Sequence, residues 1–248
     1  MTFFRRSARG LFFLGLLLLW QFSCDRAWTG GRILASPLQI SASFLELCRS
    51  GELPLHVLAS LGRILGGYLL AAPLGVFLGL LLGVDKRLRY FCEPLLAVLR
   101  PIPPLAWVPL AILWFGLGNG PAYFVTAIAA FFPIFTNTLS GVRNVPERYL
   151  EVARIFGAEK RLQLIDVVFP AALPFIAAGL RVGLMVAWMS VIAAEMVSSS
   201  HGLGYFIESS QEMLNTPAVM VGMMTIGLVG VAMDAGLKRL EKRFLRWN

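Results

Sequence analysis

The sequence ERYLEVARIFGAEKRLQLIDVVFPAALP, at Glu147–Pro174, is a polar segment between two long apolar runs, and it decides the fold. Its first half has the periodicity of an amphipathic helix. The apolar residues near one face are Leu150, Ala153, Ile155 and Phe156, and the charged residues largely opposite them are Glu147, Arg148, Glu151 and Arg154. We therefore expect a short helix outside the membrane, between two spans.

The end of this helix and the start of a second one can also be located. Gly157 stands where a C-cap glycine belongs. A second amphipathic turn covers residues 159–168, and we expect Pro170 to end it. Periodicity alone leaves two interpretations open: a docking element for a partner protein, or a solvated helix that only connects spans.

The spacing within the segment resembles a known signature. Glu151-Val152-Ala153, three residues, Gly157, nine residues and Val167-Val168-Phe169-Pro170 resemble the EAA signature of ABC importer permeases, Glu-Ala-Ala, three residues, Gly, nine residues, Ile-x-Leu-Pro. Val152, Val167 and Phe169 are conservative departures from it. The resemblance implies a loop at 143–175 that docks on an ATP-binding subunit, through Glu147, Glu151, Ala153, Gly157, Ala158, Val167, Pro170 and Pro174.

Further motifs extend the resemblance along most of the chain after residue 50. They resemble the nitrate/sulfonate/taurine-type permease family and are Ser60–Arg63, Leu99–Leu110, Phe115–Gly118, Gly179–Arg181, Ala193–Glu195 and Gly202–Tyr205. The resemblance implies a homodimer with two ATP-binding subunits and a periplasmic solute-binding protein. ATP and magnesium would then bind the partner subunits and not this chain. The implied cargo is a small oxyanion such as a sulfonate, taurine or nitrate, and a pyrimidine-type vitamin precursor is the alternative.

Composition indicates a membrane protein independently of any motif. The chain is 57% hydrophobic and 15% charged, against roughly 25% charge in soluble domains. We predict an all-α integral membrane protein, one domain over residues 1–248, because no linker or low-complexity segment divides it. A span needs about 20 apolar residues, and the six predicted spans are about 10–24, 55–83, 94–117, 121–142, 176–199 and 217–237.

The first run is short for a span. Arg5, Arg6 and Arg9 followed by Leu11–Trp20 also resemble the start of a signal peptide, but Phe22-Ser23-Cys24 is a poor cleavage site. We therefore expect a retained span, and cleavage would leave five.

Basic residues set the orientation. Sixteen Lys and Arg residues lie beside alternate ends of the spans, in the N-terminal stretch, after the second and fourth spans and in the C-terminal tail, whereas the other loops hold Arg26, Arg32 and Arg49. The positive-inside rule then puts both termini in the cytoplasm. We expect a multi-pass protein of a bacterial inner membrane, and the net charge of +8 is a topological signal rather than a nucleic-acid surface.

Motifs for chemistry are missing from the sequence. It has no nucleophile–base set, no paired carboxylates and no phosphate-binding Gly-x-x-x-x-Gly-Lys-Ser/Thr loop, so we expect neither catalytic nor metal-binding residues and no ATP hydrolysis by this chain. A passive channel or a membrane enzyme would be the rivals from other classes. Cys24, Cys48 and Cys92 have no metal spacing, and two unpaired thiols are favoured over a Cys24–Cys48 disulfide.

Charged and helix-breaking residues inside spans are the candidate transport residues, because a charge at membrane depth costs about 2.5–3.5 kcal/mol. Arg63 and Glu195 have similar depth in the outer third, so we expect them to pair. The alternative is that Arg63 binds an anionic cargo and Glu195 gates it. Prolines should break the third span and make it a wall of the path. The full set is Arg63, Arg100, Pro101, Pro103, Arg181, Trp188 and Glu195; for Arg100 and Arg181, snorkelling to the interface is equally consistent with their positions.

The charge asymmetry generates a topology prediction. A reporter fused after Asn248 should report cytoplasm, and one fused at Gly118, between the third and fourth spans, should report periplasm. Alkaline phosphatase and fluorescent-protein fusions give opposite signals on the two sides and make the measurement. A periplasmic signal at Asn248 would contradict the six-span arrangement.

Overall fold

A computed structural model describes residues 2–26 and 34–244 of the protein, and all regular structure in those ranges is helical, as predicted. Arg32 and Arg246, which were counted for the topology, lie outside the described residues. The elements are α1 (Thr2–Asp25), α2 (Pro37–Arg49), α3 (Glu52–Val84), α4 (Lys86–Leu99), η1 (Pro104–Trp107), α5 (Val108–Phe115), α6 (Asn119–Arg143), α7 (Glu147–Ile155), α8 (Lys160–Leu162), η2 (Gln163–Val168), α9 (Phe169–Ser198), α10 (Leu203–Glu212) and α11 (Thr216–Phe244).

Four of the predicted spans are long apolar helices. They are Glu52–Val84, Asn119–Arg143, Lys160–Ser198 and Thr216–Arg243, and a fifth candidate consists of two helices bent by 88°. The first predicted run lies in α1, where the apolar helix Leu14–Asp25 is shorter than these spans. The count of six therefore stays a prediction.

The third span differs from its predicted bounds. α4 already begins at Lys86, where the Asp85 side chain caps it by accepting from the backbone N–H groups of Arg87 and Leu88. Residues 86–93, which were expected in a loop, are therefore helical. The helix ends at Leu99 because the prolines that follow donate no backbone hydrogen bond and disfavour helix in the residue before them. The predicted break is present.

Pro170 does not end the segment that precedes it, contrary to expectation. Lys160–Ser198 is one continuous helix of 39 residues, and Gln163–Val168 within it forms a π turn. There the Phe169 N–H bonds the carbonyl of Leu164, five residues back. The wider π turn leaves room for the Pro170 ring, which a regular α-helix would press against the preceding turn. The fifth span thus begins well before residue 176.

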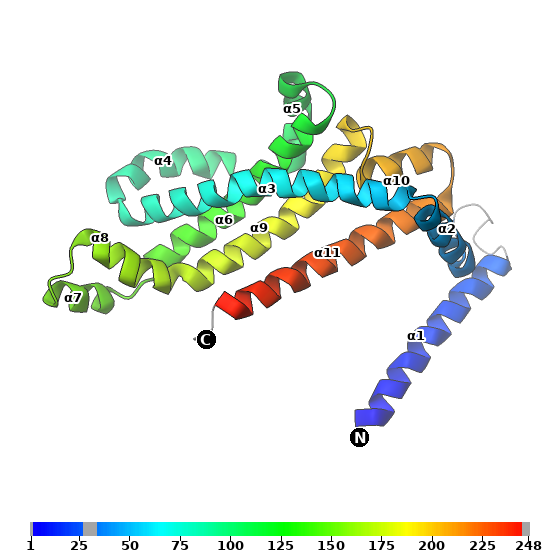
Figure 1. Ribbon diagram of the computed structural model, residues 1–248, viewed down its shortest axis with the longest axis horizontal. Helices are drawn as coiled ribbons and strands as arrows, with labels where there is room; N and C mark the ends of the chain where they lie inside the picture. The colour runs from blue at the N-terminus through cyan, green and yellow to red at the C-terminus, as the bar shows by residue number, and fades with distance from the viewer. Residues whose placement is uncertain (1, 27–33, 245–248) are drawn as a thin grey trace.

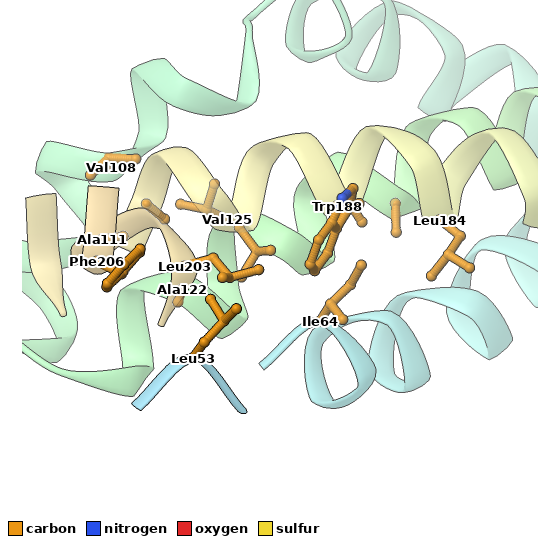
Figure 2. Packing of buried hydrophobic residues seen from close by; sticks show 14 of the residues in the cluster. Leu53, Ile64, Val108, Ala111, Ala122, Val125, Leu184, Trp188, Leu203 and Phe206 are labelled. Atoms are coloured by element: carbon orange, nitrogen blue, oxygen red, sulfur yellow. The ribbon is translucent and has the colours of Figure 1, made fainter. Parts of the chain in front are cut away.

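α6 is the centre of the bundle and packs against α3 on one side and α9 on the other. Glycines of α3 and α9 lie at these contacts. A Cβ added to Gly79 would lie 2.6 Å from that of Thr138, and one added to Gly183 would lie 2.7 Å from Cγ1 of Ile134. Small residues therefore let the helices approach closely. Figure 2 shows the apolar core between them, with Ile64 from α3, Val125 from α6 and Trp188 from α9.

The long helices run along one direction and separate two ends of the molecule (Figure 1). One end carries α7, α8 and the start of α4, and the C-terminal end of α11 points toward it. The other end carries α2 and α10. α1 stands off the bundle and contacts α2.

The three cysteines are free thiols, as favoured from the sequence.

Candidate functional site

The polar segment forms a helix ended by a Schellman motif. Gly157, with φ of 75°, is in the left-handed region predicted for it. The N–H of Ala158 bonds the carbonyl of Ala153 at 2.9 Å, and the N–H of Gly157 bonds that of Arg154 at 2.9 Å. These two bonds satisfy carbonyls that the end of α7 would otherwise leave unpaired. Only glycine adopts this backbone conformation without strain, so Gly157 fixes where α7 stops.

α7 presents apolar side chains to its surroundings at the tip of the molecule. Ile155 and Phe156 are 82% and 84% exposed. Leu150, on the inner side, packs against the small buried cluster of Val142, Val168, Ala172 and Ile176 at the ends of α6 and α9. The helix is therefore anchored on one side and bare on the other.

The other residues that the resemblance assigns to the docking loop differ in how exposed they are. Glu147 and Glu151 are exposed, and the half-buried ones are Ala153, Ala158, Val167, Pro170 and Pro174.

At the opposite end of the bundle, Arg63 and Glu195 form the expected ion pair. Nη1 of Arg63 lies 2.8 Å from Oε1 of Glu195, and the two residues are 6% and 0% exposed. The same guanidinium donates from Nε to Oδ1 of Asn119 at 2.8 Å and from Nη1 to the carbonyl of His201. In this structure Nε and Nη1 of Arg63 are engaged by the protein itself, which favours pairing over the alternative of cargo binding.

The N-terminus of α10 is capped by side chains from other helices. The backbone N–H groups of Gly202, Leu203 and Gly204 donate, in that order, to Nδ1 of His56 at 3.0 Å, Oγ of Ser60 at 2.8 Å and Oε2 of Glu195 at 3.0 Å. Ser60 also donates to Glu195 at 2.8 Å. A helix start leaves such N–H groups without partners and carries partial positive charge. A buried carboxylate is therefore doubly favourable here.

Both glycines of this turn are required by the cap. Gly202 has φ of 117°, and a Cβ there would overlap the Glu195 carboxylate. A Cβ on Gly204 would overlap the backbone carbonyl of Ile192 on α9. Leu203 and Gly204 form the buried first turn of α10.

Sequence reasoning missed His56, Ser60 and Asn119 as members of this cluster. The sequence contains a signal for His56 and Ser60. Ser60 lies four residues after His56 and three before Arg63, so the three side chains share one face of an otherwise apolar α3. Asn119 is the first residue of α6 and carries no comparable pattern.

Arg100 borders a cavity of about 310 Å³ beside the break between α4 and η1. The cavity is lined by Arg100, Ile102, Pro104, Ile128, Ala129, Phe132, Pro133, Thr136, Asn137, Val182 and Val186. Asn137 donates from Nδ2 to the carbonyl of Pro133 at 2.8 Å, which leaves its side-chain oxygen free to accept. Within the described residues, the Arg100 side chain has no ion-pair or hydrogen-bond partner.

The remaining candidates lie elsewhere. Arg181 bonds from Nε to Oδ1 of Asp234 on α11 at 2.6 Å, and Asp234 also pairs with Lys238 at 2.7 Å. Trp188 is buried in the core, where its Nε1 donates to the carbonyl of Ile226 at 3.2 Å. Pro101 and Pro103 are exposed and shape the break without lining the cavity.

Comparison with known proteins identifies this architecture. Residues 71–246 match the family described as binding-protein-dependent transport system inner membrane component. The chain belongs to this family, whose members are multi-pass permease subunits of ABC importers.

Individual relatives agree. A putative ABC transporter permease of Methanocaldococcus jannaschii is 44% identical over 83% of this chain and 77% of its own length. A putative aliphatic sulfonates transport permease of Bacillus subtilis is 37% identical over 94% and 84%. Other relatives are named for taurine and for bicarbonate transport. An amino acid ABC transporter solved with histidines shares the fold, with a TM-score of 0.64 and 17% identity over 86% of this chain and 99% of that one.

The buried cluster generates a stability prediction. Glu195→Gln leaves Arg63 buried without a counter-charge and weakens the α10 cap, and breaking such a pair costs about 3–5 kcal/mol. We expect a several-fold loss of monodisperse protein in fluorescence-detected size-exclusion chromatography. Glu195→Gln combined with Arg63→Gln should recover part of it.

The matched control is Glu212→Gln, which removes an exposed carboxylate from the far end of α10. It should leave the yield near wild type. A normal yield of Glu195→Gln with impaired transport would instead favour a gating role for Glu195.

Proposed function

We propose that this chain works as a homodimeric permease that couples ATP hydrolysis in two partner subunits to import of a small oxyanion delivered by a periplasmic binding protein. The observation that carries the proposal is the apolar tip of α7, Ile155 and Phe156, held at the end of an anchored helix. Exposed aromatic and aliphatic side chains on a rigid support are typical anchors for a protein partner.

The position of α7 fits a coupling role. It lies between α6 and the long helix Lys160–Ser198, so a push on α7 acts on both inner helices of the bundle. That long helix ends at the Glu195 cluster on the other side of the protein. Alternating access then follows as rocking of packed helices about a central site. The orientation that we propose places α7 and both termini in the cytoplasm.

The cargo proposal rests on the Arg100 cavity. An unpaired guanidinium beside free oxygen acceptors suits a small anion that also carries a hydrogen-bond donor or a small apolar part, since Phe132 and Val182 complete the lining. A sulfonate or taurine meets that description best, and relatives are named for both. A neutral pyrimidine-type precursor leaves the charge of Arg100 uncompensated and is the second candidate.

The coupling role can be tested by comparing two glycines with the same backbone strain. Gly157 and Gly51 have φ of 75° and 78°, and an added Cβ at either meets no atom within 4 Å. Gly157→Val should misplace the tip of α7 and reduce co-purification of the ATP-binding subunit about tenfold or more. Gly51→Val, at the start of α3 on the outer side, should retain it.

Quantitative co-purification from membranes, normalised to the permease, makes this measurement without knowledge of the cargo. Equal retention of the partner by both variants would overturn the assignment of α7 as the docking helix.

The cargo proposal is tested separately. Arg100→Gln should lower uptake of radiolabelled taurine and ethanesulfonate at least tenfold in proteoliposomes that contain the whole transporter and its binding protein. Arg87→Gln removes an exposed charge from the first turn of α4, away from the cavity, and should transport normally. Wild-type uptake of a pyrimidine instead of these sulfonates would replace the oxyanion proposal and leave the coupling result standing.

A further inference from the structure

A second cavity, of about 490 Å³, lies at the α7 end of the bundle. Its walls come from the turn between α3 and α4, the end of α6, α7 and the start of the helix that leads into α9. Figure 1 shows these segments gathered at one end of the protein. The residues that line it are Gly83, Val84, Lys86, Arg89, Val142, Arg143, Val145, Glu147, Leu150, Arg154, Lys160, Gln163, Leu164 and Val168.

The lining is strongly basic. Five cations, Lys86, Arg89, Arg143, Arg154 and Lys160, face one carboxylate, Glu147. In the part of the chain that the structure describes, none of these five side chains has an ion-pair or hydrogen-bond acceptor. Like charges around one cavity repel each other and focus a positive potential into it. The cavity is therefore electrostatically suited to an anion from outside the chain.

Topology alone does not account for this arrangement. The positive-inside rule requires basic residues in cytoplasmic loops, but it does not determine where in those loops they lie or whether they come together in space. Arg148 and Arg161 belong to the same loop and do not line the cavity, whereas the five that do come from four separate elements. The convergence is a property of the fold.

Apart from Gln163, the rest of the lining is apolar, and it identifies the kind of anion. Val84, Val142, Leu164 and Val168 form an apolar wall at the ends of α3 and α6 and along η2. In the orientation proposed above, a cavity with a basic rim and an apolar wall at the cytoplasmic ends of the helices matches a phospholipid, with its phosphate on the cations and its first chain carbons on the valines. Acidic side chains of a docked protein would compensate the cations of the rim but would not cover the apolar wall.

We propose that this cavity binds the headgroup of an anionic phospholipid of the cytoplasmic leaflet. The bound phosphate would join Arg154 of α7 to Lys86 and Arg89 of α4, and so tie the docking helix to the spans. The ligand chemistry is one phosphodiester monoanion, or two of them, on an acylated glycerol, as in phosphatidylglycerol or cardiolipin.

Lipid retention tests the proposal without any transport measurement. The purified complex of permease and ATP-binding subunits is placed in nanodiscs of phosphatidylcholine with 20% phosphatidylglycerol, extracted, and analysed by native mass spectrometry. The triple variant Arg89→Gln, Arg143→Gln, Lys160→Gln should lose one anionic lipid per permease. Its affinity should fall about a hundredfold, at about 1 kcal/mol per basic side chain near the membrane surface.

Two matched variants separate the effect of the cavity's cations from the effects of total charge and of misfolding. Arg239→Gln, Lys242→Gln, Arg243→Gln removes the same charge from the end of α11, outside the cavity, and should retain the lipid. Arg89→Lys with Arg143→Lys keeps the charge and should also retain it. Loss of the lipid from the α11 variant, or its retention by the cavity variant, would overturn the proposal.

The source of the phosphate is decided by competition. Inorganic phosphate at 10 mM should not displace the retained lipid, because it lacks the chain that contacts the valines. Displacement by inorganic phosphate would assign the cavity to a soluble oxyanion and overturn the lipid proposal.

Discussion

The carboxylate of Glu195 holds together the end of the bundle that carries α10. It has no exposed surface, and from α9 it gathers donors from two other elements: Ser60 and Arg63 of α3 and the backbone of Gly204 at the start of α10. A charge at this depth is costly unless it is paired and hydrogen-bonded. The buried carboxylate therefore makes the helix packing specific, because only one arrangement of α3, α9 and α10 gives every polar group its partner. Asn119 brings the start of α6 into the same arrangement.

Much of the fold could be predicted because apolar length and proline position act locally. The long spans, the break near Pro101 and the left-handed Gly157 follow from residues that are neighbours in sequence. Pairing of Arg63 with Glu195 could be predicted from depth alone. The capping of α10 by His56 and Ser60 could not, because it depends on the rotation of α3 about its axis, which one sequence does not determine. Pro170 gave a wrong prediction for a related reason, because the sequence does not reveal the π turn at Gln163–Val168 that accommodates it.

The cationic residues of the spans and their ends divide into two groups by what compensates them. Arg63 and Arg181 have carboxylate partners within the chain, at 2.8 and 2.6 Å. Arg100 and the five residues of the basic cavity have none within the described residues. Ion pairs within the chain hold the helices in register. A cation without a carboxylate partner beside a cavity can instead attract an anionic ligand. The distinction separates residues that build the bundle from residues that meet other molecules.

The long helix α9 has a mechanical consequence. The π turn of η2 and Pro170 separate it from the short α8, and Figure 1 shows the helix bending there. From Phe169 to Ser198 its 30 residues, at 1.5 Å each, span roughly 45 Å, about one and a half times the hydrocarbon thickness of about 30 Å. Tilting α9 by about 10° around its middle would move each end by about 4 Å in opposite directions. A short stroke at the α7 end would then appear, with reversed sense and similar size, beside the α10 cap.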